Sequence, residues 1–164
     1  MGLAKILAKA NIGAGSKVAV MPSFYGFDSI GNALRELEAK GVFVDLDKRR
    51  LEDIKLKFPE FETVNEDVIK FAGAEIAAVI HYRPMFEYPF EAIKIAPESV
   101  IYREGFEKMV GNIRRLSSNF VLISTHDPKS INEELNSLSK FGFRVVEQGP
   151  YKDKSVERYL IGRA

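Results

Sequence analysis

Apolar runs of strand length alternate with amphipathic stretches along this chain. Residues 18–21 form the first apolar run, and residues 42–44 form the next. Between them, apolar residues recur at the i, i+3, i+4 and i+7 spacing of one helix face, namely Ile30, Ala33, Leu34 and Leu37. We expect this helix to stop at Gly41. The order strand, loop, helix, strand predicts a βαβ unit with parallel strands and a right-handed crossover.

The rest of the chain continues the same alternation. Further strands are predicted at residues 61–64, 76–80, 119–125, 143–148 and 156–162. Helical spacing predicts helices over residues 51–58, 106–113 and 131–138, and a short opening helix that carries Leu3, Ile6, Leu7 and Ala10. A turn at residues 149–153 joins the last two strands, which predicts an antiparallel hairpin. We therefore expect one α/β domain over residues 1–164, with residues 1–16 as an N-terminal helix and loop.

Residues 85–101 interrupt this regular pattern. They include Pro89, Pro97 and several aromatic side chains, and they are more numerous than an ordinary connection requires. Long irregular loops in compact domains are often lids or binding loops. An ordered insertion that packs on the body of the protein, or at a subunit interface, is an equally good interpretation. The stretch is therefore interpreted as an irregular insertion or a lid.

The composition excludes several classes of site. The 164 residues are 46% hydrophobic and 29% charged, which is typical of a soluble globular protein, and the formal net charge of +1 neither demands nor excludes nucleic acid. The absence of cysteine excludes disulfides, thiolate nucleophiles and thiolate metal ligands, and it favours a reducing compartment, so we expect a cytoplasmic location. The longest apolar runs are far too short to span a bilayer, so no membrane partner is expected.

Polar residues follow the first two predicted strands. A loop at residues 22–28 comes after the first strand, and Asp45 and Asp47 come after the second. The carboxyl ends of neighbouring parallel strands meet at one edge of the sheet, and open α/β sheets bind their ligands there. The sequence therefore predicts a ligand site between this loop and the two aspartates.

Five strand–helix units followed by a hairpin resemble the class I S-adenosylmethionine-dependent methyltransferase family, from about residue 3 to about residue 163. The resemblance implies a Rossmann-like, seven-stranded, mostly parallel sheet with helices on both faces and a last strand inserted antiparallel between the fifth and sixth. It also implies S-adenosylmethionine as the cofactor. The best motif match is residues 42–47 (VFVDLD), which are similar to the strand whose terminal acid binds the ribose hydroxyls. A carboxylate suits that task because it can accept two hydroxyl hydrogen bonds.

Two further family motifs are matched in part. Residues 66–68 (EDV) resemble the acid and apolar pair that meets the adenine amino group. Residues 21–27 (MPSFYGF) correspond to the glycine-rich first motif, but they hold a single glycine and lack the usual acid. The resemblance thus implies a cofactor site made by Pro22, Ser23, Gly26, Asp28, Asp45, Asp47, Glu66 and Asp67. For Asp47, a helix cap is the alternative interpretation.

The acceptor side of the site is less defined. Amino-group methyltransferases of this fold carry Asn/Asp-Pro-Pro-Tyr after the fourth strand, whereas residues 82–85 (YRPM) match only the second proline. The methyl acceptor, whether a small molecule, RNA or protein, is therefore unassigned, and a homodimer stays open. His81, Tyr82 and His126 are expected at the ligand edge and are the candidates for positioning the acceptor or removing its proton. Two histidines alone do not predict a metal site.

Two other functions stay open. Residues 26–31 (GFDSIG) would be the Gly-x-Gly-x-x-Gly of an NAD(P)-binding Rossmann domain if the middle position were not Asp28, whose carboxylate opposes a pyrophosphate. Residues 48–50 (KRR) could hold a 2′-phosphate, or they could form a solvated helical turn. The departures in the first and fourth motifs also suit a family member that lost catalysis and kept a binding or scaffold role. Methyl transfer is the first expectation.

Overall fold

The structure is a computed structural model that describes residues 2–21, 27–83, 99–125, 135–151 and 157–164. Its strands are β1 (Lys17–Val20), β2 (Lys40–Asp45), β3 (Glu62–Asn65), β4 (Ala78–Arg83), β5 (Asn119–Thr125), β6 (Arg144–Pro150) and β7 (Glu157–Arg163). Its helices include α1 (Leu3–Lys9), α2 (Phe27–Glu36), α3 (Lys48–Lys57) and α5 (Ser99–Leu116), and residues 135–140 are also helical. Each predicted strand is therefore present, with bounds shifted by a few residues.

The described residues form one seven-stranded sheet in the order β3-β2-β1-β4-β5-β7-β6. The pairs β2–β3, β1–β2, β1–β4 and β4–β5 are parallel. Strand β7 runs antiparallel to both β5 and β6, between which it lies. The predicted Rossmann-like sheet, mostly parallel and with a C-terminal antiparallel hairpin, is confirmed.

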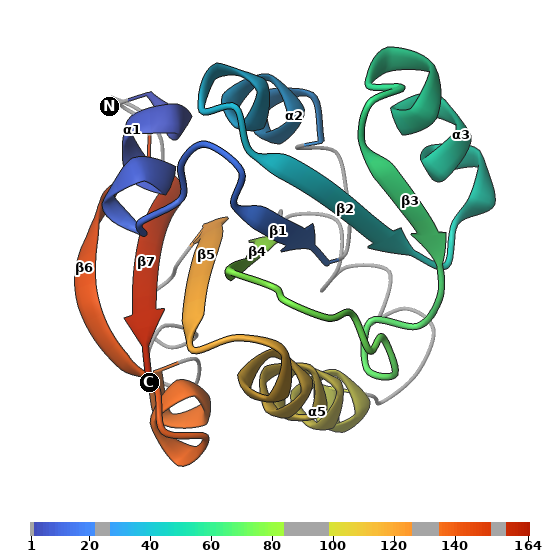
Figure 1. Cartoon of the computed structure of the whole chain (residues 1–164). Coiled ribbons are helices and arrows are strands. Elements are labelled where there is room, and N and C mark those ends of the chain that lie inside the picture. Colours follow the sequence, from blue (N-terminus) through green and yellow to red (C-terminus); the bar gives the residue numbers. More distant parts are fainter. Residues whose placement is uncertain (1, 22–26, 84–98, 126–134, 152–156) are drawn as a thin grey trace.

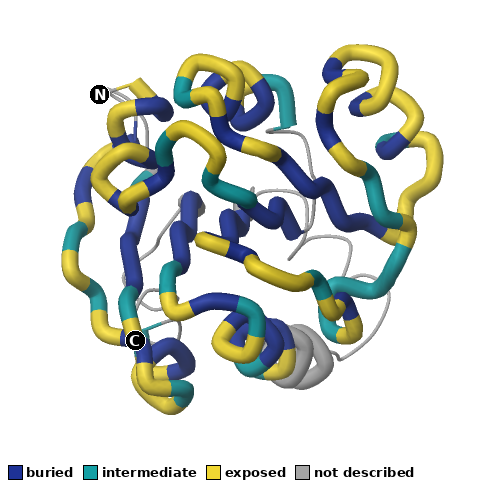
Figure 2. Tube along the Cα trace, in the orientation of Figure 1, coloured by how far each residue is buried: buried dark blue, intermediate teal, exposed yellow. Residues whose placement is uncertain are grey.

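Helices cover both faces of this sheet (Figure 1). One hydrophobic core lies under α1, α2 and α3, and among its fully buried side chains are Ile6, Leu34, Ile54 and Phe58. A second core lies under α5 and the helix at residues 135–140, and it includes Val110, Ile113 and Leu138. Alternate residues of the central strands serve the two cores, so the strands are buried on both faces (Figure 2). The near-continuous apolar strands in the sequence are explained by this double burial.

The end of α2 differs from the prediction. The helix ends at Glu36, and Glu38 takes the left-handed conformation that stops it, with φ of 54°. Gly41 lies instead inside β2, where a Cβ atom would come within 3.0–3.2 Å of Phe43, Phe61 and Leu34. The absence of a side chain at Gly41 therefore suits the close packing of these side chains against the strand.

The connection from β3 to β4 also differs, because no helix forms over residues 66–77. Residues 68–70 make a turn in which the Asp67 carboxylate accepts a hydrogen bond from the Ile69 amide at 3.0 Å. Phe71 and Ile76 then pack into the core under α5. The expectation of five strand–helix units thus fails at the third unit, where a side-chain-capped turn replaces the helix.

Several predicted features lie outside the described residues. These are Pro22, Ser23 and Gly26 of the first loop, His126, and most of the stretch at 85–101, whose last residues, from Ser99, belong to α5. Strand β4 runs through His81 to Arg83, beyond the predicted end at residue 80. Among the described residues, no helix combines the length and apolarity needed to cross a membrane.

Candidate functional site

The carboxyl ends of β1, β2 and β4 meet at one edge of the sheet. Val20 is paired with Phe43 on one side and with Ile80 on the other, so Asp45 and Tyr82 lie at the same level, two residues beyond this row. They are separated by β1, and two strand spacings put their backbones about 10 Å apart. Asp45, which is predicted to bind the ribose, and the residues predicted to position the acceptor therefore lie on the same edge, on opposite sides of β1.

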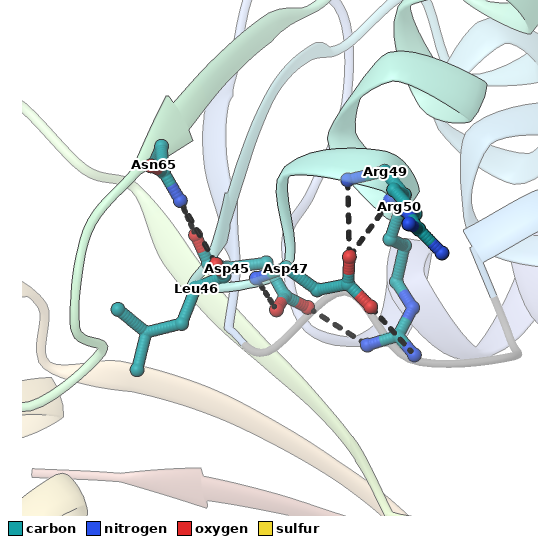
Figure 3. A network of polar contacts seen from close by, with 6 residues as sticks. All are labelled: Asp45, Leu46, Asp47, Arg49, Arg50 and Asn65. Atoms are coloured by element: carbon teal, nitrogen blue, oxygen red, sulfur yellow. Dashed lines mark hydrogen bonds and ion pairs between the residues drawn. The ribbon is translucent and has the colours of Figure 1, made fainter.

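Asp45 is the last residue of β2, and it is 6% exposed. Its Oδ1 accepts a hydrogen bond from the amide of Asp47 at 2.9 Å, and its Oδ2 lies 3.2 Å from Nη1 of Arg50 (Figure 3). The side chain of Arg50 is itself only 18% exposed. A largely buried carboxylate needs such partners, because an unpaired charge there would be costly. The strand end, the next amide and one arginine together fix the orientation of this carboxylate.

Asp47 is the N-cap of α3. Its Oδ1 accepts hydrogen bonds from the amides of Arg49 and Arg50 at 3.0 and 3.3 Å, and its Oδ2 lies 3.8 Å from Nη2 of Arg50. These contacts satisfy donors that the first helical turn leaves without an intrahelical partner. Asp47 is therefore a helix cap, as the alternative interpretation predicted. Its assignment as a cofactor ligand stays a prediction.

Asn65 completes the polar network in Figure 3. It is the last residue of β3 and the register partner of Asp45, and its side-chain amide donates to the carbonyls of Asp45 and Leu46, both at 3.1 Å. Leu46, held between these contacts, is 68% exposed. An apolar side chain is thus presented to solvent directly beside a buried carboxylate. Asn65 was not predicted from the sequence, where its only signal was its position at the end of a strand.

Asp28 lies in the first turn of α2, away from this network. Its Oδ1 is 2.6 Å from Nζ of Lys57, at the end of α3. The ion pair offsets the negative charge, so repulsion of a pyrophosphate by Asp28 is weaker than the sequence suggested. Its predicted role in binding the cofactor stays a prediction.

Glu66 and Asp67 follow β3 and are both partly exposed. The amide of Glu66 donates to the carbonyl of Asp45 at 3.2 Å, which joins this loop to the end of β2. Asn112 of α5 donates to the carbonyls of Val68 and Phe71, and thereby holds the turn that Asp67 begins. The structure thus brings Glu66 and Asp67 to the same edge as Asp45. Asn112 was not predicted from the sequence.

His81 is 5% exposed on β4, and its Nδ1 lies 2.8 Å from the carbonyl oxygen of Met21, which follows β1. A carbonyl oxygen only accepts, so this hydrogen bond requires a proton on Nδ1. Tyr82 is paired with Ile123 of β5. Within the described residues, no group of three or more histidine or acidic side chains is arranged to hold a metal ion.

The sequence matches no family model, and no curated protein is detectably similar to it. Solved structures are similar in fold. A candidate RNA methyltransferase from Pyrococcus horikoshii aligns with a TM-score of 0.72 at 16% identity, over 98% of this chain and 79% of that one. A TehB-like SAM-dependent methyltransferase from Corynebacterium glutamicum aligns at 0.65 and 16% identity, over 98% and 86%.

A SAM-dependent methyltransferase from Aquifex aeolicus aligns with a TM-score of 0.66 at 13% identity, over 97% of this chain and 87% of that one. These alignments span nearly all of the chain, so they include the sheet edge described above. At sequence identities this low, the structural similarity establishes the fold, but it does not by itself transfer an activity. The chain has the fold of the class I S-adenosylmethionine-dependent methyltransferases.

Proposed function

We propose that this protein transfers a methyl group from S-adenosylmethionine to an acceptor bound at the carboxyl edge of the sheet. One observation carries the proposal. Asp45 ends β2 at this edge as a 6% exposed carboxylate, and backbone and arginine donors fix its orientation. A carboxylate held in this way is suited to accept hydrogen bonds from the two hydroxyl groups of a ribose.

The neighbouring groups fit the remainder of a nucleoside. Leu46 offers an exposed apolar side chain next to Asp45, against which a base can pack. Glu66 and Asp67 offer carboxylate acceptors for an exocyclic amino group, and the Glu66 amide ties them to the end of β2. Bound S-adenosylmethionine supplies an activated methyl group on a sulfonium. The protein's own contribution is then mainly alignment of the acceptor with that group.

We place the acceptor on the β4 side of β1, near His81 and Tyr82. The contact between Nδ1 of His81 and the carbonyl of Met21 holds the imidazole ring at this edge, where we expect it to help position the acceptor or remove its proton. Proton removal matters only for an acceptor that loses a proton on methylation. The acceptor is therefore defined by its place in the site and not by its chemical class.

Binding of a dinucleotide is the less favoured alternative. The standard dinucleotide-binding order is 3-2-1-4-5-6 with parallel strands, whereas β7 here inserts antiparallel between β5 and β6. Arg50, one of three basic residues considered for a 2′-phosphate, pairs instead with Asp45 and Asp47. Both observations support the methyltransferase proposal over an NADP site.

Titration calorimetry tests the proposal with S-adenosylmethionine, S-adenosylhomocysteine, NAD and NADP. We expect S-adenosylhomocysteine to bind more tightly than either dinucleotide. Substituting Asp45→Asn should weaken this binding by about 1.5–3 kcal/mol, the range for hydrogen bonds to a charged group. Asp53→Asn is the matched control, because it removes an exposed carboxylate from α3 at the same cost in charge.

The outcomes separate the alternatives. Tighter binding of NAD or NADP would reverse the ranking of functions. Unchanged affinity in a folded Asp45→Asn variant would mean that Asp45 is not a ligand. Binding of S-adenosylhomocysteine without methyl transfer to any of small-molecule, RNA or protein acceptors would support the binding or scaffold function.

A further inference from the structure

Asn112 is a buried polar residue on an otherwise apolar face of α5. It is 5% exposed, and its helix neighbours Met109, Val110 and Ile113 are buried in the core under α5. Its side-chain amide donates to the carbonyl of Val68 at 2.7 Å and to the carbonyl of Phe71 at 3.1 Å. Both amide hydrogens are therefore used to hold one turn, the turn that follows β3.

The side-chain oxygen of Asn112 also has a hydrogen-bond partner. Arg115, one helical turn along α5, donates from Nη2 to Oδ1 of Asn112. This contact fixes which side of the amide is oxygen and which is nitrogen, so the two hydrogens face the turn. Asn112 is thus held in one orientation from its own helix while it binds a segment 41 to 44 positions away in sequence.

The turn that Asn112 holds begins at Asp67. The carbonyl of Asp67 accepts hydrogen bonds from the amides of Lys70 and Phe71 at 2.9 and 3.0 Å, and its carboxylate accepts from Ile69. Phe71 anchors the far end of the turn in the core under α5. Glu66, on the near side, is bonded to the end of β2. The position of the two carboxylates relative to Asp45 is therefore determined partly by Asn112.

We infer that Asn112 is a positioning residue that sets the base specificity of the ligand site. It holds the turn at 67–71 so that the acids after β3 face a base whose sugar is bound by Asp45. This inference rests on the proposed function and deepens it. A carboxylate accepts a hydrogen bond from the amino group of adenine, but it meets only a carbonyl oxygen at the corresponding atom of hypoxanthine.

A purely structural role makes a different prediction. Burial of an apolar residue at position 112 would also fill the space under α5, and a buried amide contributes to stability only when its hydrogen bonds are made. If Asn112 served only to stabilise the fold, its substitution would lower the unfolding midpoint. The folded protein would still prefer the adenine ligand to the hypoxanthine ligand by the same factor. The ratio of two ligand affinities therefore distinguishes positioning from stabilisation.

The test measures binding of S-adenosylhomocysteine and S-inosylhomocysteine by calorimetry, well below the unfolding temperature. In the unaltered protein we expect a preference of about tenfold or more for the adenine ligand, the size of one hydrogen bond to a charged group. Asn112→Asp places carboxylate oxygens against the carbonyls of Val68 and Phe71 and so releases the turn. In this variant the preference should fall to about threefold or less.

Asn119→Asp is the matched control. Asn119 also donates its side-chain amide to a backbone carbonyl, that of Ala10, and it lies at the start of β5. The substitution makes the same chemical change at the opposite edge of the sheet, so it should leave the preference at its original value. Hydrogen exchange gives a readout without ligand: the amides of Lys70 and Phe71 should exchange faster in Asn112→Asp than in Asn119→Asp.

The results are distinguishable. An unaltered protein that binds neither ligand overturns the proposed function, and the inference about base specificity falls with it. Binding with an unchanged adenine preference in Asn112→Asp overturns the inference alone. An equal loss of preference in Asn112→Asp and Asn119→Asp would also overturn it, because the effect would then follow from general destabilisation. Loss of preference in Asn112→Asp only, with faster exchange at Lys70 and Phe71, supports it.

Discussion

At the scale of single residues, the surroundings of Asp45 show how a carboxylate at a strand end is held in one orientation. The carboxylate is nearly buried, and Arg50 is the cation beside it, at 3.2 Å. The same guanidinium also approaches Asp47 at 3.8 Å. One arginine therefore serves two aspartates whose charges would otherwise repel each other at the edge of the sheet. Arg50 stabilises the arrangement that the ligand would meet.

The first prediction concerns this arginine. Substituting Arg50→Met should lower the free energy of unfolding by about 1–3 kcal/mol, because it leaves the buried carboxylate of Asp45 without its charged donor. Arg49→Met is the control, since Arg49 is exposed and should change stability by less than about 0.5 kcal/mol. Urea unfolding at pH 7 measures both. Equal effects of the two substitutions would show that the pair with Asp45 contributes little.

The position of Asp45 could be predicted from the sequence, whereas the contacts of Asn65 and Asn112 could not. An acid directly after an apolar run is placed at the sheet edge by the strand itself, so its position follows from local pattern. Asn112 acts on carbonyls more than forty positions earlier, and its neighbours in sequence form an ordinary apolar helix face. Nothing local marks it. Side chains that bind distant backbone become visible only when the fold is known.

At the scale of elements, the packing of α2 against the residue that caps the end of α3 depends on Gly31. A Cβ atom at this position would lie 2.4 Å from the ring of Phe58. That ring has little freedom, because it is fully buried, stacks on Phe61 with centroids 5.7 Å apart, and lies 4.5 Å beneath the guanidinium of Arg35. The last glycine of the near-match to Gly-x-Gly-x-x-Gly thus has a packing function, between α2 and the Phe58 ring at the end of α3.

The second prediction follows from this contact. Gly31→Ala should destabilise the protein by about 1–2 kcal/mol, because overpacking costs more than the gain in helix propensity. Gly13→Ala is the control, since a Cβ there meets no atom within 4 Å. In the double variant Gly31→Ala, Phe58→Leu, the loss of stability should be smaller than the sum of the losses in the two single variants. Strict additivity, measured by chemical unfolding, would mean that the alanine methyl does not contact Phe58.

Element boundaries also show where local pattern reaches its limit. The apolar runs were sufficient to predict the seven strands of the described sheet, and the central ones gave the clearest runs because strands buried on both faces have few polar residues. The predicted stop of α2 was wrong because Gly41 lies inside β2, where Leu34 and Phe61 from other parts of the chain, and Phe43 of the same strand, pack close to it. The missing helix between β3 and β4 has the same origin, since Asn112 and Phe71 hold that segment as a turn. Tertiary contacts decided both cases.

At the scale of the whole molecule, the two ends of the chain lie against each other. The side chain of Lys9, at the end of α1, pairs with Glu147 of β6, which also accepts a hydrogen bond from the hydroxyl of Tyr159 at 2.8 Å. Arg163 of β7 donates to the backbone carbonyl of Lys9 at 3.0 Å. The order of β7 and β6 was implied by family resemblance and not by the hydrophobic pattern, which contains no information on strand pairing. These contacts tie the C-terminal hairpin to α1.

The last prediction concerns the dependence of this tie on pH. Donation from Lys9, and then from Tyr159, lowers the pKa of Glu147 below its ordinary value of 4.5. A group whose pKa is depressed in the folded protein stabilises it above the unfolded-state pKa, and that contribution is lost as the pH falls through the folded-state pKa. Glu147→Gln should therefore lower the thermal unfolding midpoint at pH 7, and this deficit relative to the unaltered protein should shrink below about pH 4.5 and vanish in stronger acid.

Because all acids titrate there, the control is Glu52→Gln. Glu52 is an exposed glutamate on α3, and its substitution should leave the midpoint equal to that of the unaltered protein at each pH. A deficit of Glu147→Gln that stays constant from pH 7 to pH 3 would show that the glutamate contributes by packing and not through its charge.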